Sequence, residues 1–390
     1  MTKTLKEAAE AYKMGRKPTA DEPLLLTPGP LTTTTSVKRA MLKDWGSWDA
    51  PFRELNADIR RRLVDISGGG EEYTAVPLQG SGTFVVEAML GTFVPRGGKV
   101  LMLANGAYGE RAIKVCERMG RETVVYRTAE NEAPSAAKVA DHLRDETIDY
   151  VFMVHCETTS GIRNPVEAIA EVVQEKGRRL LVDAMSAFGA LHLDAKSVRY
   201  DAIAASANKC LEGVPGMGFV ICNKSVLAAR EGNAHSVSLD LHDQWSYMEK
   251  TRQWRFTPPT HVIAAFHQAL LEYEAEGGVR ARGTRYEVNC EHLVKGMRAL
   301  GFRTFLNDAE QAPIIVCFHA PEDPNYAFTD FYGRLARRGY VIYPGKLTQL
   351  ETFRVGCIGS MGPSDVDGVV ATVAEVLAEM GVSNGTSNAA

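Results

Sequence analysis

The chain has 390 residues, of which 45% are hydrophobic and 24% charged, so it can bury a large core as two domains or as a large domain with a smaller partner. The formal net charge of −4 and the lack of a Lys/Arg block argue against nucleic acid and anionic membranes as partners, and favour small molecules. The seven cysteines are odd in number and form no CxxC pair, which indicates neither a disulfide framework nor a metal site and favours a cytoplasmic location. No apolar run reaches about 18 residues, so we expect no membrane segment.

Short apolar runs alternate with segments of helical period over most of the chain. We expect strands at 100–103, 150–155, 179–184, 201–206 and 218–222, and helices at segments such as 83–90 and 164–177. This alternation predicts an α/β fold with a mostly parallel central sheet covered by helices on both faces, because only sheets buried on both faces have continuously apolar strands.

The pattern changes after a long expected helix at 261–278. Helices at 291–301, 328–339 and 363–381 and strands at 313–320 and 352–356 predict a smaller C-terminal α+β domain. We therefore divide the chain into an N-terminal arm at 1–23, a large domain at 24–276, a small domain at 277–382 and a disordered tail at 383–390.

Polar and glycine-rich segments follow the expected strands. In open α/β sheets, ligands bind beyond the carboxyl ends of the strands, so these segments hold the candidate site residues. They are Ser81, Gly82 and Thr83 in QGSGT, Tyr108 in ANGAYG, Thr158 in CETTSG, Asp183 in RLLVDA, and Asn208 and Lys209 in SANK.

The QGSGT segment precedes the expected helix at 83–90. Glycines on both sides of Ser81 let the backbone approach a ligand, and the helix N-terminus offers free N–H groups and a positive dipole end to a phosphate. The segment lacks the third glycine of a dinucleotide fingerprint and the ending of a P-loop, so an ordinary strand-to-helix turn remains an alternative. Packing within its turn is likewise an alternative for Tyr108.

Asp183 and Lys209 carry more information as a pair. A carboxylate within an apolar strand needs a partner, since an isolated buried carboxylate is costly or becomes neutral. Alone, Asp183 could be a cap or part of a structural ion pair, and Lys209 a solvated loop residue. Together with a phosphate cradle and an aromatic side chain, they are the equipment of a pyridoxal phosphate site.

These motifs carry a family resemblance. The sequence resembles the class V, fold-type I aminotransferases, and within them the enzymes that act on 2-aminoethylphosphonate and pyruvate. The resemblance runs from residue 24 to the last expected helix, through TPGP, QGSGTFVVEA, NGAYGER, LLVDAMSAFGA, SANKCLEGVPGMGFVI, FTPPTH and TFRVGCIG. The segment around Lys209 is the most specific of these.

The resemblance implies a role for each candidate residue. Lys209 would bind the cofactor covalently and then act as general base, and Asp183 would pair with the pyridine nitrogen. Tyr108 would stack on the ring, and Thr158 would reach its 3′ oxygen. The cofactor phosphate would be held by the QGSGT residues Ser81, Gly82 and Thr83, with Asn208 as a further cofactor-binding residue.

A homodimer with a shared active site is also implied. Thr257 in FTPPTH would contact the cofactor phosphate from the neighbouring subunit, with Thr260 of the same motif as the alternative.

Arg354 lies within the apolar segment TFRVG. A structural ion pair at a domain interface is one interpretation, and the other is a substrate-binding fork for the carboxylate of pyruvate and the phosphonate of the donor. Arg53, Arg255 and Lys346 are further candidates for a phosphonate dianion, which the sequence cannot rank and which could each be a surface charge.

The predicted reaction transfers an amino group from 2-aminoethylphosphonate to pyruvate, giving phosphonoacetaldehyde and L-alanine. The nearest alternative is a serine- or alanine-glyoxylate (or pyruvate) aminotransferase of the same family. A cysteine desulfurase would need a nucleophilic cysteine on a mobile loop, whereas we expect Cys317 and Cys357 in the core. A non-catalytic protein of the same fold is the remaining alternative.

Overall fold

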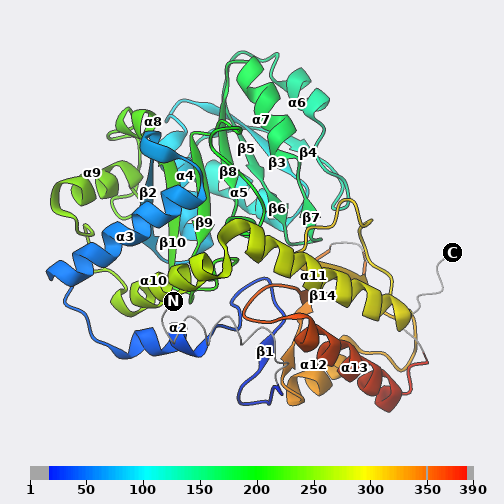
Figure 1. Ribbon diagram of the computed structural model, residues 1–390. Helices are drawn as coiled ribbons and strands as arrows, with labels where there is room; N and C mark the ends of the chain where they lie inside the picture. Colours follow the sequence, from blue (N-terminus) through cyan, green and yellow to red (C-terminus); the bar gives the residue numbers. More distant parts are fainter. Residues whose placement is uncertain (1–16, 348–349, 384–390) are drawn as a thin grey trace.

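The computed structural model describes residues 17–347 and 350–383. Most of the predicted arm (1–16) and nearly all of the predicted tail (384–390) lie outside the described residues. Figure 1 shows a larger part built around one sheet and a smaller part formed by the end of the chain. The boundaries drawn at 23, 276 and 382 stay predictions.

The larger part contains a seven-stranded sheet within the described residues, in the order β2-β10-β9-β8-β5-β3-β4. Neighbours from β9 to β4 pair in parallel, and β10 runs antiparallel to both β9 and β2. The predicted mostly parallel sheet is therefore confirmed. The strands are β2 (Tyr73–Gln79), β3 (Lys99–Ala104), β4 (Glu122–Arg127), β5 (Ile148–Val154), β8 (Arg179–Asp183), β9 (Ala202–Ser206) and β10 (Met217–Asn223).

Helices cover both faces of this sheet. Successive residues of a strand point to opposite faces, so Leu180 and Val182 of β8 pack in one core cluster and Leu181 in another. The first cluster includes side chains of α3 (Ala50–Ile66), α6 (Ala136–His142), α7 (Val166–Glu175) and α10 (Thr260–Glu276). The second includes side chains of α4 (Gly82–Phe93), α5 (Ala107–Arg118), α8 (Lys224–Ala228) and α9 (Leu241–Thr251). This double burial explains the continuously apolar strands.

A third core cluster holds the smaller part together. It lies around the antiparallel sheet β11-β14-β13 and the helices α11 to α13. β1 at Leu24–Leu25 joins it by pairing with β12, a contact that the sequence did not indicate. The other elements are β11 (Ile315–His319), β12 (Tyr340–Val341), β13 (Tyr343–Pro344), β14 (Thr352–Gly356), α11 (Gly278–Ala299), α12 (Phe328–Arg337) and α13 (Pro363–Met380).

Helix α11 connects the two parts. Its Tyr286 packs in the first cluster of the larger part, while Leu293 and Met297 pack in the third cluster.

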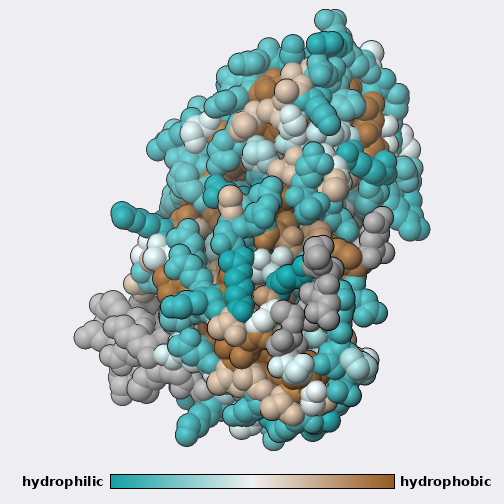
Figure 2. All heavy atoms as spheres, turned by 90° about the vertical axis from the view of Figure 1, so that its right-hand side faces the viewer, coloured by the Kyte–Doolittle hydropathy of each residue, from teal (hydrophilic) through white to brown (hydrophobic). Residues whose placement is uncertain are grey.

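Figure 2, which views the molecule from the right of Figure 1, shows a largely hydrophilic upper region and hydrophobic residues gathered in the lower region. The remaining short elements are α2 (Thr35–Arg39), η1 (Ala40–Leu42), η2 (Gly70–Glu72), β6 (Cys156–Glu157) and β7 (Ile162–Arg163).

Across the described ranges, every helix is too short or too polar to cross a lipid bilayer.

Candidate active site

The carboxyl ends of the parallel strands open into a cavity of about 550 Å³. The segments that follow β2, β3, β8 and β9 meet there because parallel strands end at the same edge of a sheet. The cavity wall includes most of the candidate residues, namely Ser81, Gly82, Thr83, Tyr108, Asp183, Asn208 and Lys209. Thr158, Thr257 and Arg354 do not line it.

Helix α4 begins at this cavity. Ser81 is its N-cap and Gly82 its first residue, so the N–H groups of the first turn lack partners within the helix. A Cβ atom at Gly82 would lie 2.5 Å from the Sδ atom of Met185, which is too close for any other residue without a shift of that side chain. The start of α4 is therefore a cradle of the kind that binds phosphates.

Lys209 follows β9 and extends towards the segment after β1. Its Nζ atom donates a hydrogen bond to the carbonyl of Pro28 at 2.6 Å. Gly29 leaves room for this side chain: its φ is +118°, and a Cβ atom there would lie 2.6 Å from the Cδ atom of Lys209. Burial lowers the pKa of Lys209 to about 8, although Cys210 and Asp183 oppose the shift. This amine therefore loses its proton more readily than an exposed lysine.

Asp183 is the last residue of β8 and is 5% exposed. One carboxylate oxygen accepts a hydrogen bond from the N–H of Met185 at 2.9 Å. Burial raises the pKa of Asp183 to about 6, while the Met185 hydrogen bond and the charge of Lys209 act in the opposite direction. Within the described structure the two side chains form no direct ion pair, and both line the same cavity.

Tyr108 lies in the first turn of α5, above a buried carboxylate. Glu157 accepts hydrogen bonds from the N–H groups of Tyr108 (3.1 Å) and Gly109 (3.3 Å), and from the N–H and hydroxyl of Thr159 (3.0 and 2.6 Å). Burial raises the pKa of Glu157, and these four hydrogen bonds lower it. Glu157 thus fixes the start of α5, and with it the position of Tyr108. Glu157 was not among the predicted site residues, although the acid in CETTSG directly follows an expected strand.

Thr158 and Arg354 lie behind Tyr108. The Tyr108 hydroxyl is buried and its pKa is raised, with a Thr158 hydrogen bond partly opposing this shift. Arg354 is 1% exposed, and its Nε and Nη1 atoms donate to the carbonyls of Pro344 (2.9 Å) and Thr158 (2.6 Å). Among the described residues Arg354 forms no ion pair with a carboxylate, so the structural ion pair suggested as an alternative is absent there.

The three other candidate cations lie in different places. Arg53 lines a separate hollow with Glu54 and Glu249. Arg255 forms an ion pair with Asp243 at 3.3 Å. Lys346 lies with its Nζ atom 4.4 Å from the centre of the Tyr108 ring.

Arg111 is a cavity residue that sequence analysis missed. It lies three residues after Tyr108 on α5, and its Nη1 atom donates to the hydroxyl of Thr83 at 3.1 Å. Its guanidinium carbon is 5.0 Å from the centre of the Tyr108 ring. The i,i+3 spacing within NGAYGER was the available signal, because residues so spaced share one face of a helix.

Thr257 is exposed, and Thr260 is the first residue of α10. Neither lines the cavity of this chain. Their predicted contact with a partner subunit stays a prediction.

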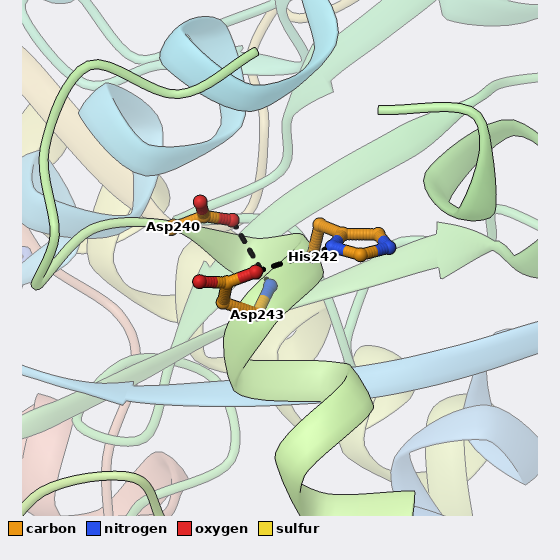
Figure 3. Close-up of side chains that lie close together, drawn as sticks. All are labelled: Asp240, His242 and Asp243. Carbon is orange, nitrogen blue, oxygen red and sulfur yellow. Dashed lines mark hydrogen bonds and ion pairs between the residues drawn. The ribbon is translucent and has the colours of Figure 1, made fainter. Parts of the chain in front are cut away.

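Asp240, His242 and Asp243 gather at the start of α9 (Figure 3) and have the residue types of a metal site. Asp240 is the N-cap of this helix and accepts the N–H of Asp243 at 3.0 Å. The side chain of Asp243 lies 3.3 Å from His242 and 3.3 Å from Arg255. Helix capping and ion pairing therefore account for the group.

All seven cysteines are free and buried. Cys317 and Cys357 belong to β11 and to the segment after β14, and both are fully buried, as predicted. Burial raises the pKa of Cys317 to about 11, so its thiol is a poor nucleophile.

Comparison with known proteins gives close relatives over nearly the whole chain. The "2-aminoethylphosphonate--pyruvate transaminase" of a Pseudomonas fluorescens strain is 57% identical over 93% of this chain and 98% of its own length. Proteins of the same name from Pseudomonas aeruginosa and Pseudomonas putida are each 56% identical, over 92% and 93% of this chain and 97% and 99% of their own lengths.

Solved structures share the fold. A ureidoglycine-glyoxylate aminotransferase of Bacillus subtilis superposes with a TM-score of 0.85 at 23% identity, covering 93% of this chain and 94% of that one. A pyridoxamine-pyruvate aminotransferase of Mesorhizobium loti has a TM-score of 0.84 at 24% identity, covering 93% and 95%. The family model "Aminotransferase class-V" matches residues 55–342, and the chain belongs to this family.

Proposed function

We propose that the protein is a pyridoxal phosphate-dependent transaminase that moves the amino group of 2-aminoethylphosphonate to pyruvate, with phosphonoacetaldehyde and L-alanine as products. The observation that carries the proposal is the convergence of a buried amine, Lys209, and a buried carboxylate, Asp183, on one cavity at the sheet edge. The substrates are proposed from the names of relatives that are 55–57% identical to this chain.

The residues of the cavity fit the proposed cofactor in charge and shape. When bound, pyridoxal phosphate supplies an electron-withdrawing ring that stabilises the negative charge left when a proton leaves the carbon next to nitrogen. The start of α4, with Ser81, Gly82 and Thr83, would bind its phosphate. Asn208, which lies in the same cavity wall, would complete this binding surface.

Asp183 and Lys209 would act at the two ends of the ring. With a pKa of about 6, Asp183 is mostly ionised at neutral pH and can accept a hydrogen bond from a protonated ring nitrogen. The Lys209 amine, with a pKa of about 8, can form the covalent link and can take and return the substrate proton. Tyr108 would cover one face of the ring, and Thr158 would bind its 3′ oxygen.

Arg354 would bind the acid group of each substrate in turn. Its Nε and Nη1 atoms bind backbone carbonyls, while its Nη2 atom has no hydrogen bond to a described residue. A planar guanidinium held in this way suits both a carboxylate and a phosphonate.

A second copy of the chain would complete the site. Thr257 is exposed beside Phe256, which is 47% exposed. A contact of 3.1 Å between the Nε2 atom of His261 and a carboxylate oxygen of Asp44 brings this segment near Leu42 and Trp48, which are 83% and 70% exposed. Exposed apolar side chains of this size indicate a protein interface, so a homodimer that presents Thr257 to the partner's cofactor phosphate is proposed. A cytoplasmic location is proposed from the seven reduced, buried cysteines.

A donor screen with pyruvate as acceptor tests the proposal. Loaded enzyme is supplied with 2-aminoethylphosphonate, serine or alanine, with glyoxylate as a second acceptor, and the amino-acid and aldehyde products are quantified. We expect equal amounts of L-alanine and phosphonoacetaldehyde from 2-aminoethylphosphonate and pyruvate. Faster turnover of serine, or of alanine with glyoxylate, would contradict the substrate assignment and favour the related aminotransferases.

A further inference from the structure

Lys346, one of the three candidate cations that the sequence could not rank, lies against the site. Lys346 follows β13 by two residues, and its Nζ atom is 4.4 Å from the centre of the Tyr108 ring. The amine is partly buried, and burial lowers its pKa; repulsion from Arg111 and Arg354 adds to this effect, while the charge of Glu157 opposes it. Among the described residues no carboxylate forms an ion pair with it. A partly buried ammonium group beside two other cations is unfavourable unless an anion binds there.

Lys346 and Arg354 come from neighbouring segments of the smaller part, and neither lines the cavity itself. Tyr343 of β13 pairs with Arg354 of β14, and Pro344 accepts a hydrogen bond from the Nε atom of Arg354 at 2.9 Å. The guanidinium carbon of Arg354 also lies 5.0 Å from the centre of the Tyr343 ring. The backbone that carries Lys346 is therefore held by Arg354.

Arg111 is held at the start of α4 and not beside Arg354. Its hydrogen bond to Thr83 ties it to the first turn of α4, which is the proposed phosphate end of the cofactor site. The three cations thus come from two parts of the molecule: Arg111 of α5 is tied to α4 through Thr83, whereas Lys346 and Arg354 belong to the smaller part. Two anionic groups, one on the cofactor and one on the substrate, match this division.

We propose that Lys346 determines substrate specificity by binding the phosphonate group of the donor together with Arg354. This inference rests on the proposed function and names the residue that would distinguish its two substrates. A phosphonate has three acceptor oxygens and, like a phosphate monoester, between one and two negative charges near neutral pH. A carboxylate has two oxygens and one charge, which the guanidinium of Arg354 alone can match. Lys346 would bind the additional oxygen of the phosphonate and balance its additional negative charge.

Binding of two unreactive acids tests the proposal without turnover. The dissociation constants of ethylphosphonate and propionate are measured by calorimetry on loaded enzyme for the wild type, Lys346→Met and Lys346→Arg. We expect Lys346→Met to weaken ethylphosphonate about 10- to 100-fold, the usual effect of losing a charge-assisted hydrogen bond, and propionate by about threefold or less. Lys346→Arg should recover most of the ethylphosphonate affinity.

Lys138→Met is the matched control. Lys138 also places its amine over a tyrosine ring, 5.9 Å from the centre of Tyr126, but on α6. The Lys138→Met variant should have the same dissociation constants for ethylphosphonate and propionate as the wild type.

The kinetic split should agree: in Lys346→Met the KM for 2-aminoethylphosphonate rises far more than the KM for pyruvate. Equal losses for both acids, or no loss for ethylphosphonate, would overturn the role of Lys346. A wild-type enzyme that forms no alanine from 2-aminoethylphosphonate would instead overturn the proposed function.

Discussion

Two groups of buried charges lie on either side of the Lys209 segment and are built on opposite principles. In the cavity, Lys209 and Asp183 form no ion pair with each other in the described structure. Burial raises the pKa of Asp183 and lowers that of Lys209, so it favours the uncharged form of each. The second group begins at Glu212, three residues after Lys209. Glu212 forms an ion pair with Arg285 at 2.7 Å, and Glu276 forms ion pairs with both Arg285 and Arg282 at 2.7 Å.

The second group, Glu212, Glu276, Arg282 and Arg285, is here called the ion cluster. The charges of Arg282 and Arg285 lower the pKa of Glu212 although burial raises it. Arg285 also donates to the carbonyls of Gly359 (2.6 Å) and Met361 (2.9 Å), so the cluster joins the Lys209 segment to the smaller part. Paired buried charges hold a structure together, whereas unpaired ones hold a place for a ligand at a cost in stability.

The largest expected effect is on turnover. Lys209→Ala removes the amine that would hold the cofactor and carry the proton, so the transamination rate should fall at least about 100- to 10,000-fold. Formation of alanine from 2-aminoethylphosphonate and pyruvate measures it. Because a buried, unpaired amine is lost, urea unfolding of the cofactor-free variant should occur at no lower a midpoint than in the wild type. Retained turnover would disprove the role of Lys209.

Breaking the ion cluster should have the largest effect on folding. Glu212→Gln leaves the two buried guanidinium groups of Arg282 and Arg285 with only the carboxylate of Glu276 to share in the ion cluster, and the free energy of unfolding should fall by about 3–5 kcal/mol. Glu249→Gln is the control, since its ion pair with Arg60 is at the surface and should contribute less than about 1 kcal/mol. If the free energy of unfolding falls by less than about 1 kcal/mol in both variants, the ion cluster has no structural role.

Asp183→Asn should increase the free energy of unfolding at neutral pH, whereas Glu212→Gln should decrease it. Folding raises the pKa of Asp183 from 3.8 to about 6, so the folded state keeps a proton that the unfolded state has released between these values. Stability is therefore lost as the pH rises through this window, and the loss is complete above pH 6. At about 1.4 kcal/mol per pKa unit, the cofactor-free variant should be up to about 3 kcal/mol more stable than the wild type at pH 7, and about equal below pH 3.8.

Urea unfolding of the cofactor-free proteins at pH 3.5 and pH 7 measures this difference. The variant should at the same time bind pyridoxal phosphate more weakly. Asp65→Asn, at an exposed ion pair with Arg61, is the control and should change stability by less than about 0.5 kcal/mol. A destabilised Asp183→Asn variant at pH 7 would mean that Asp183 is a structural residue after all.

The smallest effect is expected at the start of α4. In Gly82→Ala the new Cβ atom crowds Met185, whose flexible end can move at a cost of about 1 kcal/mol. Affinity for pyridoxal phosphate should therefore fall about fivefold in a fluorescence titration. Gly97→Ala, whose Cβ atom meets nothing within 4 Å, should bind as the wild type does. Unchanged affinity of Gly82→Ala would remove the argument for close approach at this turn.

The sequence was informative wherever position along a strand decides position in space. Asp183 and Lys209 could be placed together because each follows or ends a strand of one mostly parallel sheet. The order of the sheet and the pairing of β1 with β12 depend on contacts between distant segments, which no local pattern encodes.

Residues that act through distant contacts were missed or left unranked. Glu157 supports Tyr108 across 49 residues, and Lys346 reaches the same ring from the smaller part of the chain. Glu212 has a positive φ of 56° directly after the Lys209 turn, and the sequence gives no sign of the arginines that hold it. Such contacts form only in the folded chain, because they join segments that are far apart in the sequence.

The most direct measurement of the central claim is the site of cofactor attachment. Loaded protein is reduced with borohydride, digested and analysed by mass spectrometry, with Lys346→Met and Lys138→Met treated in parallel. We expect one cofactor mass per chain on the peptide that contains Lys209, in the wild type and in both variants. Attachment to a different lysine, or no attachment in a protein that still forms alanine, would contradict it.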